Sequence, residues 1–189
     1  THVKGKELDR IRDKMQIVFQ DPYSSLNPRI RIESTIKEPL KHSGRFHGKN
    51  EIQEEANRLM ELVGIDERLR QSYPHELDGG RRQRVGIARA LALNPDFIVC
   101  DEPVSALDVS IQAQVLNLLM DLQEKMGVAY MFVTHDLSVV RHISDHICVM
   151  YLGQLVEKAP TEELFLQNSK NLQKLVGEDE IVLPKGSNI

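Results

Sequence analysis

Short apolar runs that alternate with helical stretches constrain the fold of this chain more than any other feature. Runs of strand length occur at residues 15–19, 97–101, 128–133, 147–152 and 154–158. Between them, apolar residues recur at helical spacing over residues 34–41, 50–63, 81–93 and 111–126. Strands that alternate with helices indicate an α/β fold with a mostly parallel sheet.

The interval from residue 22 to 93 departs from this alternation. It contains helical spacing and turn residues but no convincing strand, so we expect a helical insert there. Gly64 is expected to end the helix over 50–63, and Leu152-Gly153-Gln154 to form a tight hairpin turn between the last two strands. Residues 177–189 have the composition of a polar tail.

Composition excludes several classes of protein. The 189 residues include 11 Gly, 8 Pro and 2 Cys, which does not fit a collagen, a disordered chain or a disulfide scaffold. The formal net charge of −4 gives no overall attraction to nucleic acid, and we interpret the basic cluster 81–84 as a solvated helix face. No run approaches the roughly 18 apolar residues of a membrane span, and the first residues do not resemble a signal peptide.

The two cysteines also indicate a compartment. Cys100 and Cys148 each lie inside an apolar run, where a buried thiol is more typical than a disulfide or a metal ligand. A reducing cytoplasm fits this pattern best.

Two acidic residues follow the apolar run at 97–100. Asp101 and Glu102 are expected at the carboxyl end of a buried strand, where open α/β sheets place their ligand sites. One carboxylate there can hold Mg²⁺ and the next can orient a water toward a phosphate. Taken alone, the pair is equally consistent with solvated acids at a strand end.

Other segments favour the functional interpretation. Gly79 and Gly80 open a helix, and the backbone N–H groups of a helix start suit an anion. Ser105-Ala106-Leu107-Asp108 follows the two acids, and Thr134-His135-Asp136 ends the next strand. Together with Gln20-Asp21-Pro22, these blocks in this order resemble the ATP-binding subunits of ABC transporters. The segments 15–29 and 105–115 are most similar to the peptide and nickel importers, and the resemblance covers about residues 1–165.

The resemblance implies a role for each matching residue. Gln20 corresponds to the Q-loop glutamine that senses Mg²⁺ and the attacking water, and Asp101 to the Walker B ligand of Mg²⁺. Glu102 corresponds to the general base, and His135 to the switch histidine that contacts the γ-phosphate. The signature segment Asp78, Gly79, Gly80 and Arg81, together with the D-loop residue Asp108, would contact ATP at a dimer seam.

The chain departs from the family pattern in three places. It contains no Gly-x-x-x-x-Gly-Lys-Ser/Thr phosphate loop, which the family places upstream of the Q-loop, so we expect the chain as given to bind ATP weakly. In the family this phosphate loop belongs to an inner strand and the helix that follows it. Without that strand and helix, we expect apolar sheet surface to be exposed. Asp78 and Arg81 replace the family's Ser and Gln, and a carboxylate 4 Å from a phosphate charge costs about 4 kcal/mol at an effective dielectric of 20. Residues 164–170 lack the His-Pro-Tyr segment of the subgroup.

These observations lead to one main expectation and two alternatives. We expect a P-loop NTPase-like α/β fold, with a partial ATPase core at 1–21 and 94–160, a helical subdomain carrying the signature at 22–93, and a C-terminal tail at 161–189. The expected function is the ATPase subunit of an oligopeptide or dipeptide importer at the cytoplasmic face of the plasma membrane. Its expected partners are ATP, Mg²⁺, a second ATPase subunit and transmembrane permease subunits, without nucleic acid. The alternatives are a degenerate subunit that dimerises without hydrolysing ATP, and an ABC ATPase outside transport.

Overall fold

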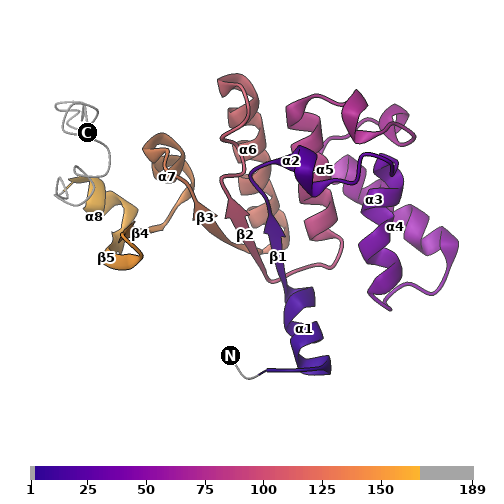
Figure 1. The fold of residues 1–189 in the computed structure, drawn as a ribbon, viewed down its shortest axis with the longest axis horizontal. Helices are drawn as coiled ribbons and strands as arrows, with labels where there is room; N and C mark the ends of the chain where they lie inside the picture. The colour runs from indigo at the N-terminus through magenta and orange to yellow at the C-terminus, as the bar shows by residue number, and fades with distance from the viewer. Residues whose placement is uncertain (1–2, 167–189) are drawn as a thin grey trace. The chain divides into compact units, whose positions relative to one another are not determined.

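A three-stranded parallel sheet organises the first part of the molecule. The computed structural model describes residues 3–166, in two compact units, of which the first ends at His135 and the second begins at Asp136. In the first unit the sheet has the order β1 (Met15–Val18), β2 (Phe97–Asp101), β3 (Ala129–Val133), as Figure 1 shows. Both strand pairs are parallel. The predicted α/β class and these three strands are confirmed.

One face of this sheet is buried. Val18, Ile98 and Cys100 point to this face and are at most 3% exposed. Helix α5 (Gly79–Leu91) packs against β1 and against α6 (Val109–Met126). Burial raises the pKa of the Cys100 thiol to about 12, so this cysteine is an inert core residue, as predicted.

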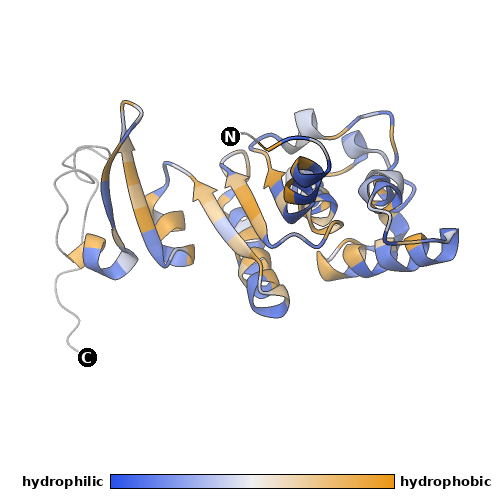
Figure 2. Ribbon diagram, turned by 90° about the horizontal axis from the view of Figure 1, so that it is seen from below, coloured by the Kyte–Doolittle hydropathy of each residue, from blue (hydrophilic) through white to orange (hydrophobic). Residues whose placement is uncertain are grey.

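The opposite face of the sheet is apolar and exposed. The register aligns Ile17 with Val99 and Val99 with Met131, and Ile17 and Met131 are 41% and 47% exposed. Figure 2 shows hydrophobic colouring along these strands. Parallel sheets are normally covered on both faces, so this exposed apolar surface is unusual and agrees with the expectation from the sequence.

Helices fill the interval between β1 and β2. They are α2 (Pro22–Ser25), α3 (Ile32–His42), α4 (Lys49–Leu62), two short 3-10 turns, η1 (Glu67–Leu69) and η2 (Pro74–Glu76), and then α5. No strand occurs between residues 22 and 93, all of which the structure describes. Helices α3 and α4 pack on each other and on α5, and Ile32, Ile36 and Leu59 are fully buried there. Gly64, with φ of +68°, follows the end of α4 as predicted.

The second unit, as far as it is described (residues 136–166), contains an antiparallel hairpin and two short helices. Its elements are α7 (Leu137–Ile143), β4 (His146–Tyr151), β5 (Gln154–Pro160) and α8 (Thr161–Leu166). Leu152 and Gly153 both have positive φ and connect the paired residues Tyr151 and Gln154, which confirms the predicted tight hairpin turn, although Gln154 already belongs to β5. Ile147, Val149 and Leu164 form a small core. Cys148 lies between the first two of these and points away from that core, so its predicted burial is wrong.

Other differences from the predictions concern short or solvated elements. Helix α1 (Lys6–Lys14) was not predicted, because Leu8 and Ile11 are its only apolar residues, and it buries no residue. Helix α2 is a single turn within a segment predicted as a loop, and α6 begins two residues before its predicted start. The predicted tail at 161–189 begins with α8, and residues 177–189 lie outside the described part. The predicted division into a core and a helical subdomain remains a prediction.

Candidate functional site at the carboxyl end of the parallel sheet

Glu102 stands immediately after β2 in an unusual backbone conformation. Its φ is +44°, a left-handed conformation that costs a non-glycine residue of the order of 1 kcal/mol. The Glu102 N–H still donates to the Val133 carbonyl at 2.8 Å, which extends the pairing of β2 and β3 by one bond. The Glu102 carbonyl accepts from the Ser105 hydroxyl at 3.1 Å, which closes the following turn. The chain therefore reverses sharply at Glu102 and leaves its side chain at the sheet end.

Gln20 and His135 both contact the Glu102 carboxylate. Gln20 Nε2 donates to Oε2 at 2.7 Å, and His135 Nδ1 lies 3.0 Å from Oε1. Because a carboxylate only accepts hydrogen bonds, this contact assigns a proton to Nδ1. The Glu102 side chain is 24% exposed and that of His135 is 77% exposed. Gln20, Glu102 and His135 each follow a different strand of the sheet. Gln20 and His135 thus both contact the Glu102 carboxylate, which solvent can reach.

Asp101 is the last residue of β2 and pairs with Val133. It is half-buried, and its place in the strand alternation puts it on the same sheet face as Val99. Gln20 uses its nitrogen toward Glu102, which leaves its carbonyl oxygen as a possible metal ligand. Within residues 3–166 no group of three His, Cys, Asp or Glu side chains is arranged to hold a metal ion. One carboxylate and one amide oxygen fit Mg²⁺, which usually takes one or two protein oxygens and completes its shell with phosphates and water.

The signature segment forms a second group, centred on the start of α5. Asp78 caps the helix: its Oδ1 accepts from the Arg81 N–H at 2.7 Å. Its Oδ2 lies 3.4 Å from Arg81 Nε, so Arg81 also pairs with the carboxylate. Both side chains are more than half exposed, and pairs of this kind contribute little to stability. Arg81 therefore partly neutralises the charge that Asp78 brings to this helix start.

Gly80 is required by packing against the segment that contains Asp108. A Cβ atom at Gly80 would lie 2.4 Å from Ile111 Cγ2, and one at Gly79 would lie 3.0 Å from Leu107 Cδ2. Asp108 precedes α6 and accepts from the Ile111 N–H through its backbone carbonyl at 2.9 Å, but its side chain forms no capping bond. Gly79, Gly80 and Asp108 thus lie together where the start of α5 meets the start of α6.

The sequence interpretation missed the residues that support these groups. Gln112 Nε2 donates to the carbonyls of Val104 and Leu107, both at 3.1 Å, and so holds the turn after Glu102. Arg82 lies 5.4 Å from the ring centre of Tyr23 on α2. These contacts join residues that are distant in sequence or lie within a loop, so no local pattern indicates them.

Comparisons with known proteins agree with these motifs. The family described as ABC transporter matches residues 1–105. The oligopeptide transport ATP-binding protein OppF of Bacillus subtilis (strain 168) is 52% identical over 160 residues, which cover 85% of this chain and 52% of that protein. The dipeptide transport ATP-binding protein DppF of Haemophilus influenzae is 54% identical over 154 residues, which cover 82% of this chain and 47% of that protein. The chain spans about half the length of the curated relatives it matches.

Two solved structures share the fold. CbiO1 of Clostridium perfringens, part of the ABC transporter complex cbiONQ, superposes with a TM-score of 0.77 at 25% identity, over 94% of this chain and 68% of that one. The ATP-binding cassette MJ0796, solved as a dimer in a post-hydrolysis state with ADP and Pi, gives a TM-score of 0.72 at 30% identity, over 85% of this chain and 68% of that one.

Proposed function

The chain belongs to the ABC transporter family, and on that premise we propose that it is part of the ATP-hydrolysing subunit of a peptide importer. Relatives at 52% and 54% identity are named as oligopeptide and dipeptide transport ATP-binding proteins, which supports peptides as the transported class. Membership of this family implies nucleotide binding. The single observation that carries the hydrolytic function is the contact of the Glu102 carboxylate with both Gln20 and His135.

Glu102 is the proposed general base. A carboxylate that is reachable from solvent and held by two neighbours is suited to accept a proton from a water attacking the γ-phosphate. Gln20 would orient that water through its amide. His135, with Nδ1–H directed at Glu102, would fix the carboxylate and turn its other ring nitrogen toward the substrate.

Asp101 and the Gln20 carbonyl oxygen are the proposed protein ligands of Mg²⁺. When bound, the ion would neutralise charge on the β- and γ-phosphates of ATP. Asp101 directly precedes the proposed base in sequence, so the residue that would hold the cation and the residue that would accept the proton belong to one site.

The second group of residues is proposed to act on a partner subunit's nucleotide. Asp78, Gly79, Gly80, Arg81 and Asp108 gather where the start of α5 meets the start of α6, and the related cassette bound to ADP and Pi is a dimer. Partnership with permease subunits would place the protein at the cytoplasmic face of the membrane. Within the described residues no helix is long and apolar enough to cross a bilayer.

A degenerate subunit is the second candidate function. The carboxylate of Asp78 stands where the family has a serine hydroxyl, and it would repel a phosphate. Its ion pair with Arg81 at 3.4 Å reduces this repulsion, which favours the active subunit.

The function can be tested by replacement within a relative. We would exchange the matching segment of Bacillus subtilis OppF for this chain, which gives a hybrid protein of the relative's full length, and express it in a strain that lacks OppF. We expect the hybrid to restore uptake of a labelled oligopeptide, and its Glu102→Gln variant to restore none. Hybrid protein that accumulates normally but supports no uptake would contradict the importer function, and ATP hydrolysis by that same protein would then favour an ABC ATPase outside peptide transport.

A further inference from the structure

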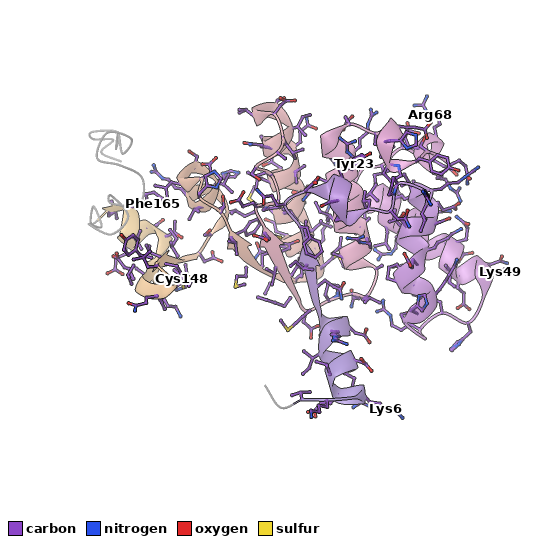
Figure 3. All side chains as sticks on the ribbon, in the orientation of Figure 1. Lys6, Tyr23, Lys49, Arg68, Cys148 and Phe165 are labelled. Carbon is purple, nitrogen blue, oxygen red and sulfur yellow. The ribbon has the colours of Figure 1, made fainter. Side chains whose placement is uncertain are left out.

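Two arginines of α5 hold the short helix α2, which follows Gln20. Arg89 Nη1 donates to the carbonyl of Ser25 at 2.6 Å, and the Arg82 guanidinium lies over the ring of Tyr23. Figure 3 shows Tyr23 where α2 lies against α5, and the two helices are in contact. The segment after Gln20 is therefore fastened to the helix that begins with the signature glycines.

Arg89 occupies an otherwise apolar part of α5. Its neighbours Ala88 and Ala90 are at most 3% exposed, and burial lowers the pKa of its guanidinium although Glu38 acts in the opposite direction. Burying a charged side chain is costly unless it is paired or hydrogen-bonded. The bond to Ser25 is a charge-assisted hydrogen bond to the carbonyl of the last residue of α2.

Hydrogen bonds within residues 21–25 connect the Arg89–Ser25 contact to Gln20. The Ser25 N–H donates to the Asp21 carbonyl at 3.2 Å, and the Tyr23 N–H donates to Asp21 Oδ1 at 2.8 Å. Asp21 is bonded to Gln20, whose side chain reaches Glu102. Fixing the Ser25 carbonyl therefore fixes the turn from which Gln20 extends.

We propose that Arg89 is a positioning residue for the hydrolytic site, acting through α2 on Gln20. This inference rests on the proposed function. In this inference Arg89 keeps the Gln20 amide within hydrogen-bond distance of Glu102. The hydrolytic site is thereby connected to α5, the helix that begins with the signature glycines. A displacement of about 1 Å at a catalytic group can cost a factor of roughly a hundred in rate.

Arg84 offers a matched control on the same helix. Its Nη1 donates to the Val63 carbonyl at the end of α4 at 2.7 Å, so it makes the same kind of bond as Arg89. Val63 is the residue that follows α4, whereas Ser25 belongs to the short helix that follows Gln20. Arg84→Met and Arg89→Met therefore remove equivalent bonds at different places.

The first experiment needs no ATP. Amide hydrogen exchange is measured on the 189-residue chain and on both variants. We expect Arg89→Met to accelerate exchange in residues 20–26, and Arg84→Met to accelerate it near residue 63 only. Unchanged exchange at 20–26 in Arg89→Met would overturn the proposal.

The second experiment measures coupling in the hybrid protein. We expect Arg89→Met to lower kcat by between about ten- and a hundredfold with little change in KM, and to have almost no effect in a Gln20→Ala background. Arg89→Lys should recover part of the loss, and Arg84→Met should leave kcat unchanged. Equal losses from Arg89→Met with and without Gln20 would overturn the proposal. A hybrid without any turnover would contradict the proposed function instead, while the exchange experiment would still decide whether Arg89 holds the Gln20 segment.

Discussion

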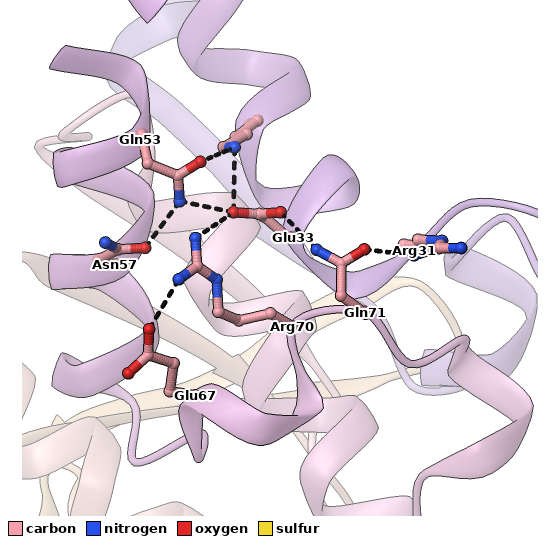
Figure 4. Close-up of polar contacts among 8 residues, drawn as sticks. Arg31, Glu33, Gln53, Asn57, Glu67, Arg70 and Gln71 are labelled. Atoms are coloured by element: carbon pink, nitrogen blue, oxygen red, sulfur yellow. Dashed lines mark hydrogen bonds and ion pairs between the residues drawn. The ribbon is translucent and has the colours of Figure 1, made fainter. Parts of the chain in front are cut away.

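Glu33 on α3 is the most thoroughly paired carboxylate among the described residues. It is 9% exposed, and its Oε1 lies 2.5 Å from Arg70 Nη2, 2.5 Å from Gln53 Nε2 and 3.0 Å from Lys37 Nζ (Figure 4). Gln71 donates to Oε2 at 3.1 Å. Burial alone would raise the pKa of Glu33, but the hydrogen bonds from Arg70, Gln53 and Lys37 outweigh it and lower the pKa to about 2.

This network should make the stability of the protein depend on pH. Because the folded pKa lies below the unfolded value of 4.5, ionised Glu33 stabilises the fold above about pH 5, and this stabilisation is lost as the pH falls toward 2. We expect Glu33→Gln to lower the free energy of unfolding at pH 7 and to make it less dependent on pH between 5 and 2. Urea titrations at several pH values measure this, with the exposed Glu61→Gln as control. Parallel pH curves for the parent and Glu33→Gln would show that the network does not stabilise the fold through charge.

The effect of Asp78 and Arg81 on ATP-driven dimerisation can be tested by restoring the family residues. We expect Asp78→Ser with Arg81→Gln to strengthen ATP-driven dimerisation of the hybrid, since the repulsive carboxylate is removed. Light scattering with Mg-ATP, in a Glu102→Gln background that prevents turnover, measures the dimer. Equal dimerisation before and after the change would mean that the Arg81 pairing already neutralises Asp78.

At the scale of elements, the contact between α5 and α6 depends on Gly80. An added methyl group at Gly80 would meet Ile111 at 2.4 Å, whereas one at Gly86 on the same helix would meet nothing within 4 Å. We expect Gly80→Ala to lower the free energy of unfolding by about 1–3 kcal/mol through overpacking. Gly86→Ala should raise it by up to about 1 kcal/mol, because alanine favours helix. Thermal unfolding compares the two, and equal effects would contradict the close packing at Gly80.

The elements that were predictable from sequence are those with a strong periodic or capping signal. α4 has an apolar stripe and ends before Gly64, α5 has a carboxylate cap, and β2 is a continuous apolar run, so each was placed within about two residues, as expected for element boundaries. α1 has only two apolar residues, Leu8 and Ile11, among seven polar ones, and α2 is one turn long. Neither leaves a periodic pattern for the sequence to show.

At the scale of the whole molecule, the meeting of Gln20, Glu102 and His135 followed from topology. All three follow parallel strands, and the carboxyl ends of parallel strands lie at one edge of a sheet. The Glu33 network and the Arg89 contact were not predictable, because they depend on how side chains from separate helices reach one another. Except for one lysine on α3 itself, the partners of Glu33 and Arg89 lie 20 to 64 positions away in the sequence, so only the packed helices show which groups meet.

The exposed apolar face of the sheet should make the chain self-associate. Ile17 and Met131 lie in one register across β1 and β3, on the uncovered side. We expect Ile17→Lys to reduce association of the 189-residue chain in sedimentation velocity. Ile11→Lys on α1 makes the same change at a similarly exposed residue off the sheet and should not reduce it. A monomeric parent, or equal effects of the two variants, would contradict this assignment.

We propose above all that Glu102, held by Gln20 and His135, is the general base of ATP hydrolysis. Phosphate release by the hybrid protein, measured together with Mg-ATP binding, tests it most directly. We expect Glu102→Gln to lower turnover by at least about a hundredfold while binding persists, because general-base catalysis contributes of the order of 10²–10⁴. Glu124→Gln, an exposed carboxylate on α6, should change neither. Turnover of Glu102→Gln within about twofold of the parent would contradict the claim and require a different base.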